Sequence, residues 1–313
     1  MSTPKLSVVI ATFKRYEVLP EAIDSILSQQ RLTRKDIEII VVDNTPATER
    51  QVVNNGHKCD HFITEDISGL SRARNIGIKS SSAQLIAFLD DDAIASPTWA
   101  SEAINLMSKN PNWDVIGGRI IARYPDNNKP IWIDAKLEEF LSCIDWKVDQ
   151  PTSMADDDIW IAGANMIFRR RVFERGIGFD ERLGRNGSSS LLSNDETKLF
   201  ESVGKNRIYY VPQMAVDHVI PNSRLDPQWF RKRIFWQAIS DIIAGTTWLS
   251  SEEAYQRFAD DILQVPAEYR SYRAMEFVPR NSEDMNRQLR MIYSQLMIMM
   301  HGAPNFSWPQ EQG

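Results

Sequence analysis

The sequence predicts an α/β protein with a mainly parallel central sheet, flanked by helices and followed by a helical C-terminal part. Three observations predict this fold. Short β-branched runs alternate with helical patterns over residues 1–95, which is typical of a doubly wound sheet. The run at residues 85–89 is apolar throughout, as expected for a strand buried on both faces. After residue 221, apolar residues recur at helical spacing.

The first part of the chain supplies the elements of a parallel sheet in order. Leu6–Thr12 is a β-branched run and predicts the first buried strand. Apolar residues between Leu19 and Leu27 lie on one helical face, and Ile37–Val42 predicts the second strand. His61–Thr64 is expected to form a short third strand, and a helix then leads into the strand at 85–89. A strand, a helix and a strand in succession indicate a parallel pair with a right-handed crossover.

The next part continues the alternation less clearly. A helix is expected over Trp99–Leu106 and a strand over Trp113–Ile121. Residues 124–158 are polar, contain prolines and are hard to assign to helix or strand; a long loop of this kind in a compact domain is usually functional or flexible. Further strands are expected over Ile159–Phe168 and Ile208–Val211.

Carboxylates follow two of the predicted strands. Asp90, Asp91 and Asp92 come directly after the run at 85–89, and Asp43 ends the second strand. Neighbouring parallel strands end at the same sheet edge, so we expect these acids to lie together. Such carboxylates repel one another unless a cation lies among them, and a divalent metal with oxygen ligands is suited to that place. Alternation along the chain predicts that Asp90 and Asp92 face the same side. The alternatives are a solvated acidic turn for the triplet and a turn-forming role for Asp43.

Two arginines lie between these acids in the sequence. If the helix that carries Arg72 and Arg74 points to the same edge, their guanidinium groups are placed to bind a diphosphate. The alternative for each of them is a solvated helix face.

A second set of polar residues comes late in the chain. Asp195 and Glu196 follow Asn194, a good N-cap residue, so we expect both in the first turn of a helix. A carboxylate beside a metal site is what a general base requires, and simple helix-start chemistry is the alternative. His218 stands in an apolar segment. Imidazole readily completes a metal sphere begun by carboxylates, and a packed core histidine is the alternative.

The C-terminal part carries an amphipathic stripe over Phe230–Ile243 and a weaker one over Leu289–Met299. We expect the first stripe to pack on the preceding domain or on a second copy of the chain, which would make a homodimer. The basic residues 231–233 flank tryptophan and phenylalanine side chains, and this patch is a candidate for contact with a membrane surface. A solvated helix face is the alternative.

Composition excludes several classes of protein. The chain has 313 residues, enough for one large domain or two ordinary ones, and its net charge of −6 gives no basic field for a nucleic acid. Cys59 and Cys143 offer neither metal-site spacing nor a disulfide framework. The N-terminal residues lack the apolar run of a signal peptide, and no run approaches the ~18 apolar residues of a membrane span. We therefore expect a cytoplasmic protein whose membrane contact, if it has one, is peripheral.

Several motifs occur together in the order and spacing of a known family. They are Ser7–Arg15, Val41–Asn44, Gly69–Gly77, Phe88–Asp92, Gly163–Asn165, Asn194–Glu196 and Asp217–His218. In this combination the chain resembles a family 2 glycosyltransferase with the GT-A fold, over about residues 5–220. The resemblance implies a catalytic domain at 1–220 and a helical extension at 221–313. No single motif would be specific, whereas the combination is.

The resemblance also implies roles for individual residues. It implies six nucleotide-sugar-binding residues: Thr12, Arg15, Asp43, Arg74, Asp90 and Asp91. Of these, Asp43 would hold the nucleobase, usually uracil. Asp92 and His218 would hold Mn²⁺ or Mg²⁺ on the diphosphate. The family's catalytic base lies in a Glu-Asp pair that here reads Asp195-Glu196 in reversed order, so matching positions make Glu196 the base and leave Asp195 as the alternative.

An acceptor site completes the expectation. Trp160 is a candidate because tryptophan faces stack on sugar rings, with core packing as the alternative. Gly163 is a candidate because a small residue in a strand often marks close approach of a ligand.

The activity that the resemblance implies is sugar transfer with inversion at the anomeric carbon. The donor would be a nucleotide sugar, UDP-linked by expectation, and the acceptor a hydroxyl of a glycan or a lipid-linked saccharide, as in polysaccharide biosynthesis. Two alternatives come from other classes: a metal-dependent sugar-nucleotide nucleotidyltransferase, and a non-catalytic nucleotide-sugar-binding protein on the same scaffold.

Overall fold

The computed structural model describes residues 3–51, 58–156, 159–174, 176–187, 190–247 and 249–302. The chain divides into two compact units. We call the first the sheet unit; it comprises Met1–Asn128, Leu141–Ser190 and Asn194–Pro221. We call the second the helical unit; it comprises Lys129–Phe140, Leu191–Ser193 and Asn222–Gly313. The last part of the expected C-terminal extension, residues 303–313, lies outside the described residues.

The sheet unit contains nine strands among its described residues. They are β1 (Leu6–Thr12), β2 (Ile37–Asp43), β3 (His61–Thr64), β4 (Leu85–Asp90), β5 (Ala93–Ala95), β6 (Val115–Arg123), β7 (Thr152–Ser153), β8 (Asn165–Arg169) and β9 (Ile208–Val219). The α-helices of this unit are α1 (Leu19–Leu27), α2 (Leu70–Ser80), α3 (Trp99–Lys109) and α5 (Thr197–Val203).

The strands form one mixed sheet in the order β3-β2-β1-β4-β8-β6-β9-β5, with β7 paired to β9. The four strands β3, β2, β1 and β4 are parallel throughout, as the sequence predicts. Beyond β4 the sheet is less parallel than expected, because β8 runs antiparallel to both of its neighbours and β5 and β7 run antiparallel to β9. An apolar run identifies a buried strand but carries no information on its direction.

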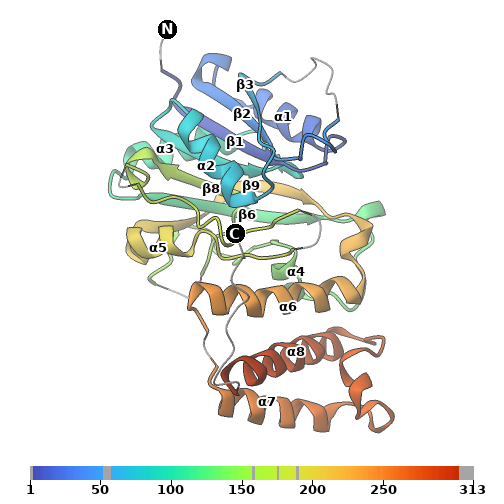
Figure 1. The fold of residues 1–313 in the computed structure, drawn as a ribbon. Coiled ribbons are helices and arrows are strands. Elements are labelled where there is room, and N and C mark those ends of the chain that lie inside the picture. The colour runs from blue at the N-terminus through green and yellow to red at the C-terminus, as the bar shows by residue number, and fades with distance from the viewer. Residues whose placement is uncertain are drawn as a thin grey trace, which may run out of the picture. The chain divides into compact units, whose positions relative to one another are not determined.

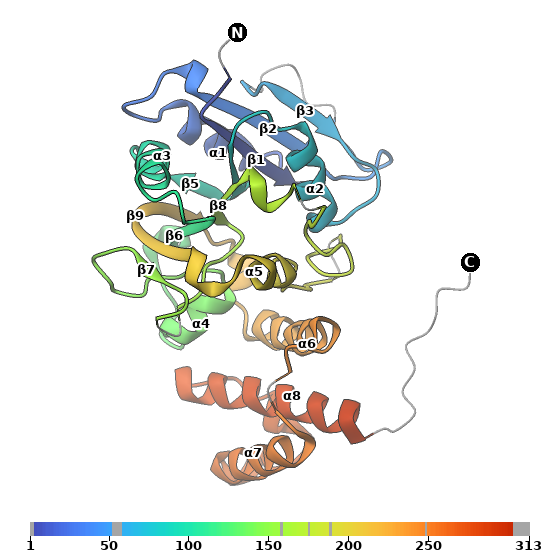
Figure 2. The same ribbon diagram turned by 90° about the vertical axis from the view of Figure 1, so that its left-hand side faces the viewer.

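The parallel register brings the predicted acids to one edge. Thr12 at the end of β1 lies opposite Asp43 at the end of β2, and its neighbour Ala11 lies opposite Asp90 at the end of β4. Helices α2 and α1 lie on opposite faces of this half of the sheet, and α3 lies against β9 (Figures 1 and 2). A Cβ atom at Gly77 would overlap the Val9 side chain, so glycine lets α2 lie close on β1.

Two of the later strands differ from the prediction. Of the expected strand over Ile159–Phe168, only residues 165–168 belong to a strand, β8, and Ile159 and residues 161–162 are buried in an irregular segment before it. Apolar burial without strand pairing produces the same sequence pattern as a strand. Strand β9 is longer than expected, with twelve residues, and it includes His218.

The helical unit contains α4 (Ala135–Phe140), α6 (Pro227–Ala244), α7 (Ser251–Gln264) and α8 (Ser282–Gly302). The stripe of α6 packs within this unit, where the Phe230 ring makes edge-on contacts with Trp132 and Phe140. The Tyr293 hydroxyl of α8 donates to Asp241 of α6 across 2.8 Å. Arg231 of the expected basic patch is partly buried against Gln288 and the Phe277 carbonyl. Within the described residues, no helix is both long and apolar enough to cross a membrane.

Candidate functional site

Asp91 is fixed by the loop that follows β1. The Thr12 hydroxyl donates to Asp91 Oδ2 across 2.7 Å, and Arg15 Nη1 donates to Asp91 Oδ1 across 3.0 Å. Burial raises the pKa of Asp91 to about 7; the charge of Asp92 adds to the rise and the Arg15 guanidinium opposes it. Arg15 Nη1 also lies 2.6 Å from Asp92 Oδ2, so one guanidinium spans two carboxylates of the triplet.

Asp90, Asp92 and His218 form a cluster that fits a divalent metal, and we call it the metal-type cluster. Each offers one ligand atom, and these atoms all lie within 4.8 Å of one another. Asp92 and His218 are both 2% exposed, and His218 Nε2 lies 3.1 Å from Asp92 Oδ1. Two carboxylates and an imidazole are donors that suit Mn²⁺, and carboxylates alone suit Mg²⁺. The expectation that Asp90 and Asp92 face the same side agrees with this geometry, since both contribute to the cluster.

His218 reaches the cluster because strand β9 is paired on both sides. His218 lies opposite Ala93 in β5 and opposite Ala122 in β6, and the Val219 N–H donates to the Asp92 carbonyl across 2.9 Å. The backbone of the histidine is thereby tied to the chain that carries Asp92. A residue 126 positions after Asp92 is placed beside it by strand pairing alone.

Arg74 joins the metal-type cluster to the second acidic pair. The side chain is buried, with Nη1 3.0 Å from Asp195 Oδ2 and Nη2 3.4 Å from Asp90 Oδ1. Burial acts to lower the pKa of Arg74, but the charges of Asp195 and Asp90 outweigh burial and raise it. Its neighbour Arg72 makes ion pairs with Glu65 and Glu181 instead. Of the two arginines, only Arg74 contacts the candidate site.

Asp195 and Glu196 lie just before a helix and not in its first turn. Helix α5 begins at Thr197, Glu196 is its N-cap without a side-chain capping bond, and Asn194 has a positive φ of 67°. The predicted N-cap role of Asn194 is therefore wrong: the residue turns the chain in the left-handed region, which asparagine tolerates. Ser71 Oγ donates to the Leu183 carbonyl across 2.7 Å and lies 3.2 Å from Asp195 Oδ2, so the main contact from α2 to Asp195 is that of Arg74.

Glu196 has a different environment from Asp195. Burial raises the pKa of Glu196 to about 8, the Asp195 charge adds to the rise, and the Arg74 charge opposes it. Asp195 is 4% exposed and engaged by Arg74 and Ser71, whereas Glu196 is partly exposed. The two neighbouring carboxyl groups therefore differ in their exposure to solvent and in their contact with Arg74.

Asp43 is fully buried at the end of β2. The Tyr16 hydroxyl donates to its Oδ2 across 2.9 Å, the Thr45 N–H donates to its Oδ1 across 3.0 Å, and Arg50 Nε lies 3.6 Å from Oδ2. A carboxylate has about four acceptor positions, so these donors leave capacity for one more. Asp43 shares the sheet edge with Asp90, as the sequence predicts.

The two acceptor candidates belong to the irregular segment before β8. A Cβ atom at Gly163 would overlap the Arg74 guanidinium, so the close approach here is that of a protein side chain. The ring of Trp160 lies edge-on to that of Trp146, with centroids 6.0 Å apart, and Trp146 Nε1 donates to the Trp160 carbonyl. Both tryptophans are partly exposed.

Four side chains beside the site were not predicted from the sequence: Tyr16, Arg50, Ser71 and Cys143. Tyr16 follows Arg15, and Ser71 lies inside the motif Gly69–Gly77. Their position in the sequence, next to predicted site residues, could have indicated that they lie at the site. Cys143 lies 3.8 Å from His218 Nδ1, and nothing in the sequence pattern indicates this contact.

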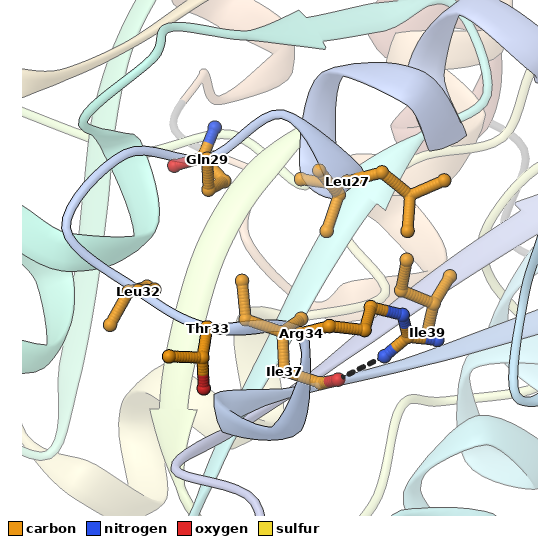
Figure 3. Close-up of a pocket in the computed structure, with 8 residues that line it drawn as sticks. Leu27, Gln29, Leu32, Thr33, Arg34, Ile37 and Ile39 are labelled. Carbon is orange, nitrogen blue, oxygen red and sulfur yellow. Dashed lines mark hydrogen bonds between the residues drawn. The ribbon is translucent and has the colours of Figure 1, made fainter.

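A small pocket elsewhere in the sheet unit lies far from these acids. It is lined by residues between Ile26 and Ile39, including Leu27, Gln29 and Arg34, and Arg34 Nη1 donates to the Ile37 carbonyl there (Figure 3). Ile37 begins β2 and Asp43 ends it, a separation of roughly 20 Å along a strand. Its lining offers one charged side chain and no acid, so we assign it no chemistry.

A family model described as glycosyl transferase family 2 matches residues 7–177, more than half of the chain. The chain belongs to glycosyltransferase family 2. The matched range begins in β1 and includes Asp43, Arg74 and the Asp90–Asp92 triplet. The enzyme is therefore a glycosyltransferase, and the family match does not support the nucleotidyltransferase or non-catalytic alternatives.

Two curated family relatives illustrate the range of similarity. A glucosyl-dolichyl phosphate glucuronosyltransferase from Haloferax volcanii is 26% identical over 274 residues, covering 83% of this chain and 84% of the relative. A GalNAc(5)-diNAcBac-PP-undecaprenol β-1,3-glucosyltransferase from Campylobacter jejuni is 38% identical over 95 residues, covering 28% of this chain and 30% of the relative.

Solved structures share the GT-A-type fold. TarS residues 1–349 from S. aureus, in complex with UDP, superimposes with a TM-score of 0.54 at 13% identity, covering 99% of this chain and 95% of that one. The mannosyltransferase PcManGT from Pyrobaculum calidifontis, in complex with GDP-Man and Mn²⁺, has a TM-score of 0.53 at 15% identity, covering 98% of this chain and 77% of that one. At such identities the likeness establishes the fold.

Proposed function

We propose that this glycosyltransferase transfers a sugar from a UDP-linked donor to a hydroxyl of a lipid-linked saccharide or glycan, with inversion at the anomeric carbon. One observation carries the proposal: Arg74 contacts both Asp90 of the metal-type cluster and Asp195 of the second acidic pair. The cluster could hold a metal-bound diphosphate, and the acidic pair could supply the base. Because Arg74 contacts both, these two parts of the proposed site are neighbours within the sheet unit.

The donor half of the site consists of strand-end residues. Asp90, Asp92 and His218 would hold Mn²⁺ or Mg²⁺, which supplies positive charge to neutralise the diphosphate leaving group. Asp43, with Thr12 and Arg15 in the adjoining loop, would bind the nucleoside. The UDP-GlcNAc complex of TarS and the GDP-Man and Mn²⁺ complex of PcManGT support this reading, because both neighbours have the same fold.

Glu196 is the proposed general base. Arg74 contacts Asp195 directly, which suits a positioning and electrostatic role for this carboxyl group. Glu196 has a raised pKa of about 8 and is partly exposed, so its ionised form is a stronger base than an ordinary glutamate and an acceptor can reach it. In the reaction, the Glu196 carboxylate takes the proton of the acceptor hydroxyl. The hydroxyl oxygen then bonds to the anomeric carbon from the face opposite the phosphate, and the bond from that carbon to the diphosphate oxygen breaks.

The acceptor class is proposed from the relatives and two candidate residues. The relatives from H. volcanii and C. jejuni carry dolichyl phosphate and undecaprenol in their names. Trp160, with Trp146 beside it, offers a partly exposed aromatic surface for a saccharide, and Gly163 keeps that segment close to Arg74. A lipid-linked acceptor would bring the enzyme to the cytoplasmic face of a membrane, as a peripheral protein.

Donor hydrolysis tests the proposal without knowledge of the acceptor. The protein is incubated with Mn²⁺ and, separately, with UDP-glucose, UDP-GlcNAc, UDP-glucuronic acid and GDP-mannose, and release of free nucleoside diphosphate is measured. We expect slow release from one UDP-sugar, abolished by EDTA. Release only from GDP-mannose would overturn the UDP assignment, and equal release with EDTA present would overturn the metal assignment.

A further inference from the structure

Cys143 lies on the far side of the His218 ring from the carboxylates. Its Sγ atom is 3.8 Å from His218 Nδ1, whereas Nε2 faces Asp92 Oδ1 at 3.1 Å. The two nitrogens are on opposite sides of the imidazole ring, so the ring stands between the thiol and the metal-type cluster. Cys143 is 5% exposed and His218 is 2% exposed, so this contact is shielded from water.

The thiol is held in place by its own backbone. The neighbouring Ile144 makes a two-bond bridge with Ile120 of β6, with both N–H to O distances at 2.9 Å. His218 lies opposite Ala122 on the same strand. The backbone segments that carry the thiol and the imidazole are thus both paired to β6, at positions two residues apart.

A metal ligand needs this kind of partner. When Nε2 of a neutral histidine binds a metal, the ring proton is on Nδ1, and that N–H requires an acceptor if it is buried. A thiol sulfur accepts such a bond weakly, and it has a hydrogen of its own to donate. The Leu141 carbonyl lies 3.6 Å from Cys143 Sγ and is placed to receive that hydrogen.

We propose that Cys143 is a positioning residue for the metal site, whose thiol accepts the Nδ1–H of His218 and donates to the Leu141 carbonyl, so that Nε2 is kept free to bind the metal. The inference rests on the proposed metal site at Asp90, Asp92 and His218. When no metal is bound, the neutral ring can carry its proton on Nε2 and donate it to Asp92. The thiol then acts as the donor, from its S–H to Nδ1. A group that both donates and accepts therefore serves the histidine with and without metal.

Mn²⁺ affinity measures this role directly, by the loss of the free-ion electron paramagnetic resonance signal on titration of metal-free protein. Cys143→Ala leaves the Nδ1–H without its acceptor, and we expect Mn²⁺ to bind about 10-fold more weakly, at the lower end of outer-shell effects. Cys143→Ser restores a hydroxyl that donates and accepts, and we expect binding between those of the wild type and Cys143→Ala. Cys59→Ser is the matched control, because Cys59 is remote from the cluster in sequence and lies just before β3, and it should bind like the wild type.

A double variant separates positioning from general damage to the fold. If the thiol acts through the histidine, Cys143→Ala should have no further effect on Mn²⁺ binding in a His218→Ala background. With Mg²⁺ bound, nitrogen-15 spectra should show a slowly exchanging His218 Nδ1–H in the wild type and Cys143→Ser, and a rapidly exchanging one in Cys143→Ala.

Two results would overturn the inference, and they differ from failure of the proposed function. Wild-type affinity in Cys143→Ala, with weakened affinity in His218→Ala, would show that the ligand is real but that the thiol does not position it. If Cys143→Ala weakened Mn²⁺ binding by the same factor with and without His218, the thiol would act on the site by another route. A wild-type protein that binds no Mn²⁺ would overturn the metal site itself, and this inference with it.

Discussion

The Arg74 guanidinium donates to the Asp195 carboxylate across 3.0 Å, although the two residues are 121 positions apart in the sequence. Both side chains are 5% exposed, and the second nitrogen of the same guanidinium lies 3.4 Å from Asp90. The ion pair therefore holds the segment before α5 against α2 beside the metal-type cluster. The guanidinium contacts Asp195 directly, whereas Glu196 next to it makes a side-chain hydrogen bond to Asp195.

Replacing the proposed base should remove turnover and leave donor binding intact. Glu196→Gln keeps the shape and most hydrogen bonding of the side chain but cannot accept a proton, so we expect turnover to fall by roughly 10²- to 10⁴-fold with unchanged UDP affinity. Asp195→Asn should reduce turnover less. Glu201→Gln, on the exposed side of α5, is the control and should be fully active. Normal turnover in Glu196→Gln together with an inactive Asp195→Asn would exchange the two roles.

The rate should depend on pH through the same residue. Because burial and the Asp195 charge raise the pKa of Glu196 to about 8, the base is mostly protonated at pH 6 and mostly ionised above 8. We expect kcat/KM to rise with pH and to level off above about pH 8. The residual activity of Glu196→Gln should lack this rise, and a wild-type profile that is flat between pH 6 and 9 contradicts the assignment.

Stability should show the opposite dependence on pH. A carboxyl group whose folded pKa is raised costs nothing below its unfolded value of about 4.3, because it is protonated in both states. As the pH rises to about 8, only the unfolded state is ionised, so the free energy of unfolding falls; above about 8 the loss is complete. Glu196→Gln has no such cost. In EDTA, its melting temperature should exceed that of the wild type by a margin that grows between pH 5 and pH 8; a constant margin argues against a raised pKa.

Removing the Arg74 charge should destabilise the sheet unit. Arg74→Met keeps much of the side-chain volume but leaves Asp195 buried without its cation, and breaking a buried pair in this way typically costs about 3–5 kcal/mol. Arg72→Met, two residues away on α2, removes an arginine that is 35% exposed and should cost less than about 1 kcal/mol. Urea unfolding of both variants measures the difference. Equal losses would mean that the Arg74 pair contributes no more than a surface pair.

Nucleotide binding should require the metal. The carboxylates of the cluster repel a diphosphate unless a cation lies between them, so calorimetry should detect UDP binding with Mn²⁺ and little or none with EDTA. Asp92→Asn should weaken Mn²⁺ and UDP binding together. Asp217→Asn is a matched control, because Asp217 precedes His218 on β9 but is exposed on the other side of the strand. UDP affinity that is the same in EDTA and Mn²⁺ removes the metal from the proposal.

Local patterns in the sequence were sufficient for the parallel half of the fold. The β-branched run Leu6–Thr12 and the short segment His61–Thr64 are strands with the predicted ends, and the helix from Leu19 to Leu27 is also as predicted. The strand Leu6–Thr12 is buried on both faces and the helix Leu19–Leu27 on one, and burial is a property that the local pattern encodes. His61–Thr64 is mostly exposed at the edge of the sheet, so its strand was predicted from its place between the second strand and the next helix. The same reasoning placed the acids at strand ends and, with the motif order, identified the family.

Only the tertiary structure decided how these residues combine. The apolar segment before β8 reads as a strand, yet it is irregular, because an apolar residue is buried equally well without strand pairing. Likewise, the left-handed backbone of Asn194 begins no helix, although an asparagine at that position is also a good cap. The first case is decided by strand pairing and the second by the backbone conformation of one residue, and neither can be read from the side-chain pattern.

The sequence by itself determined which side chains are available for chemistry: the triplet Asp90–Asp92, the pair Asp195-Glu196, and His218. The tertiary structure alone determined their partners, because each partner comes from a distant segment. Arg74 is bound to Asp195 and not to a nucleobase loop, and Cys143 reaches His218 through a bridge to β6. The physical reason is that hydrophobic periodicity fixes the burial of a residue, whereas ion pairs and hydrogen bonds between distant residues depend on strand order and register, which are set only when the whole sheet is assembled.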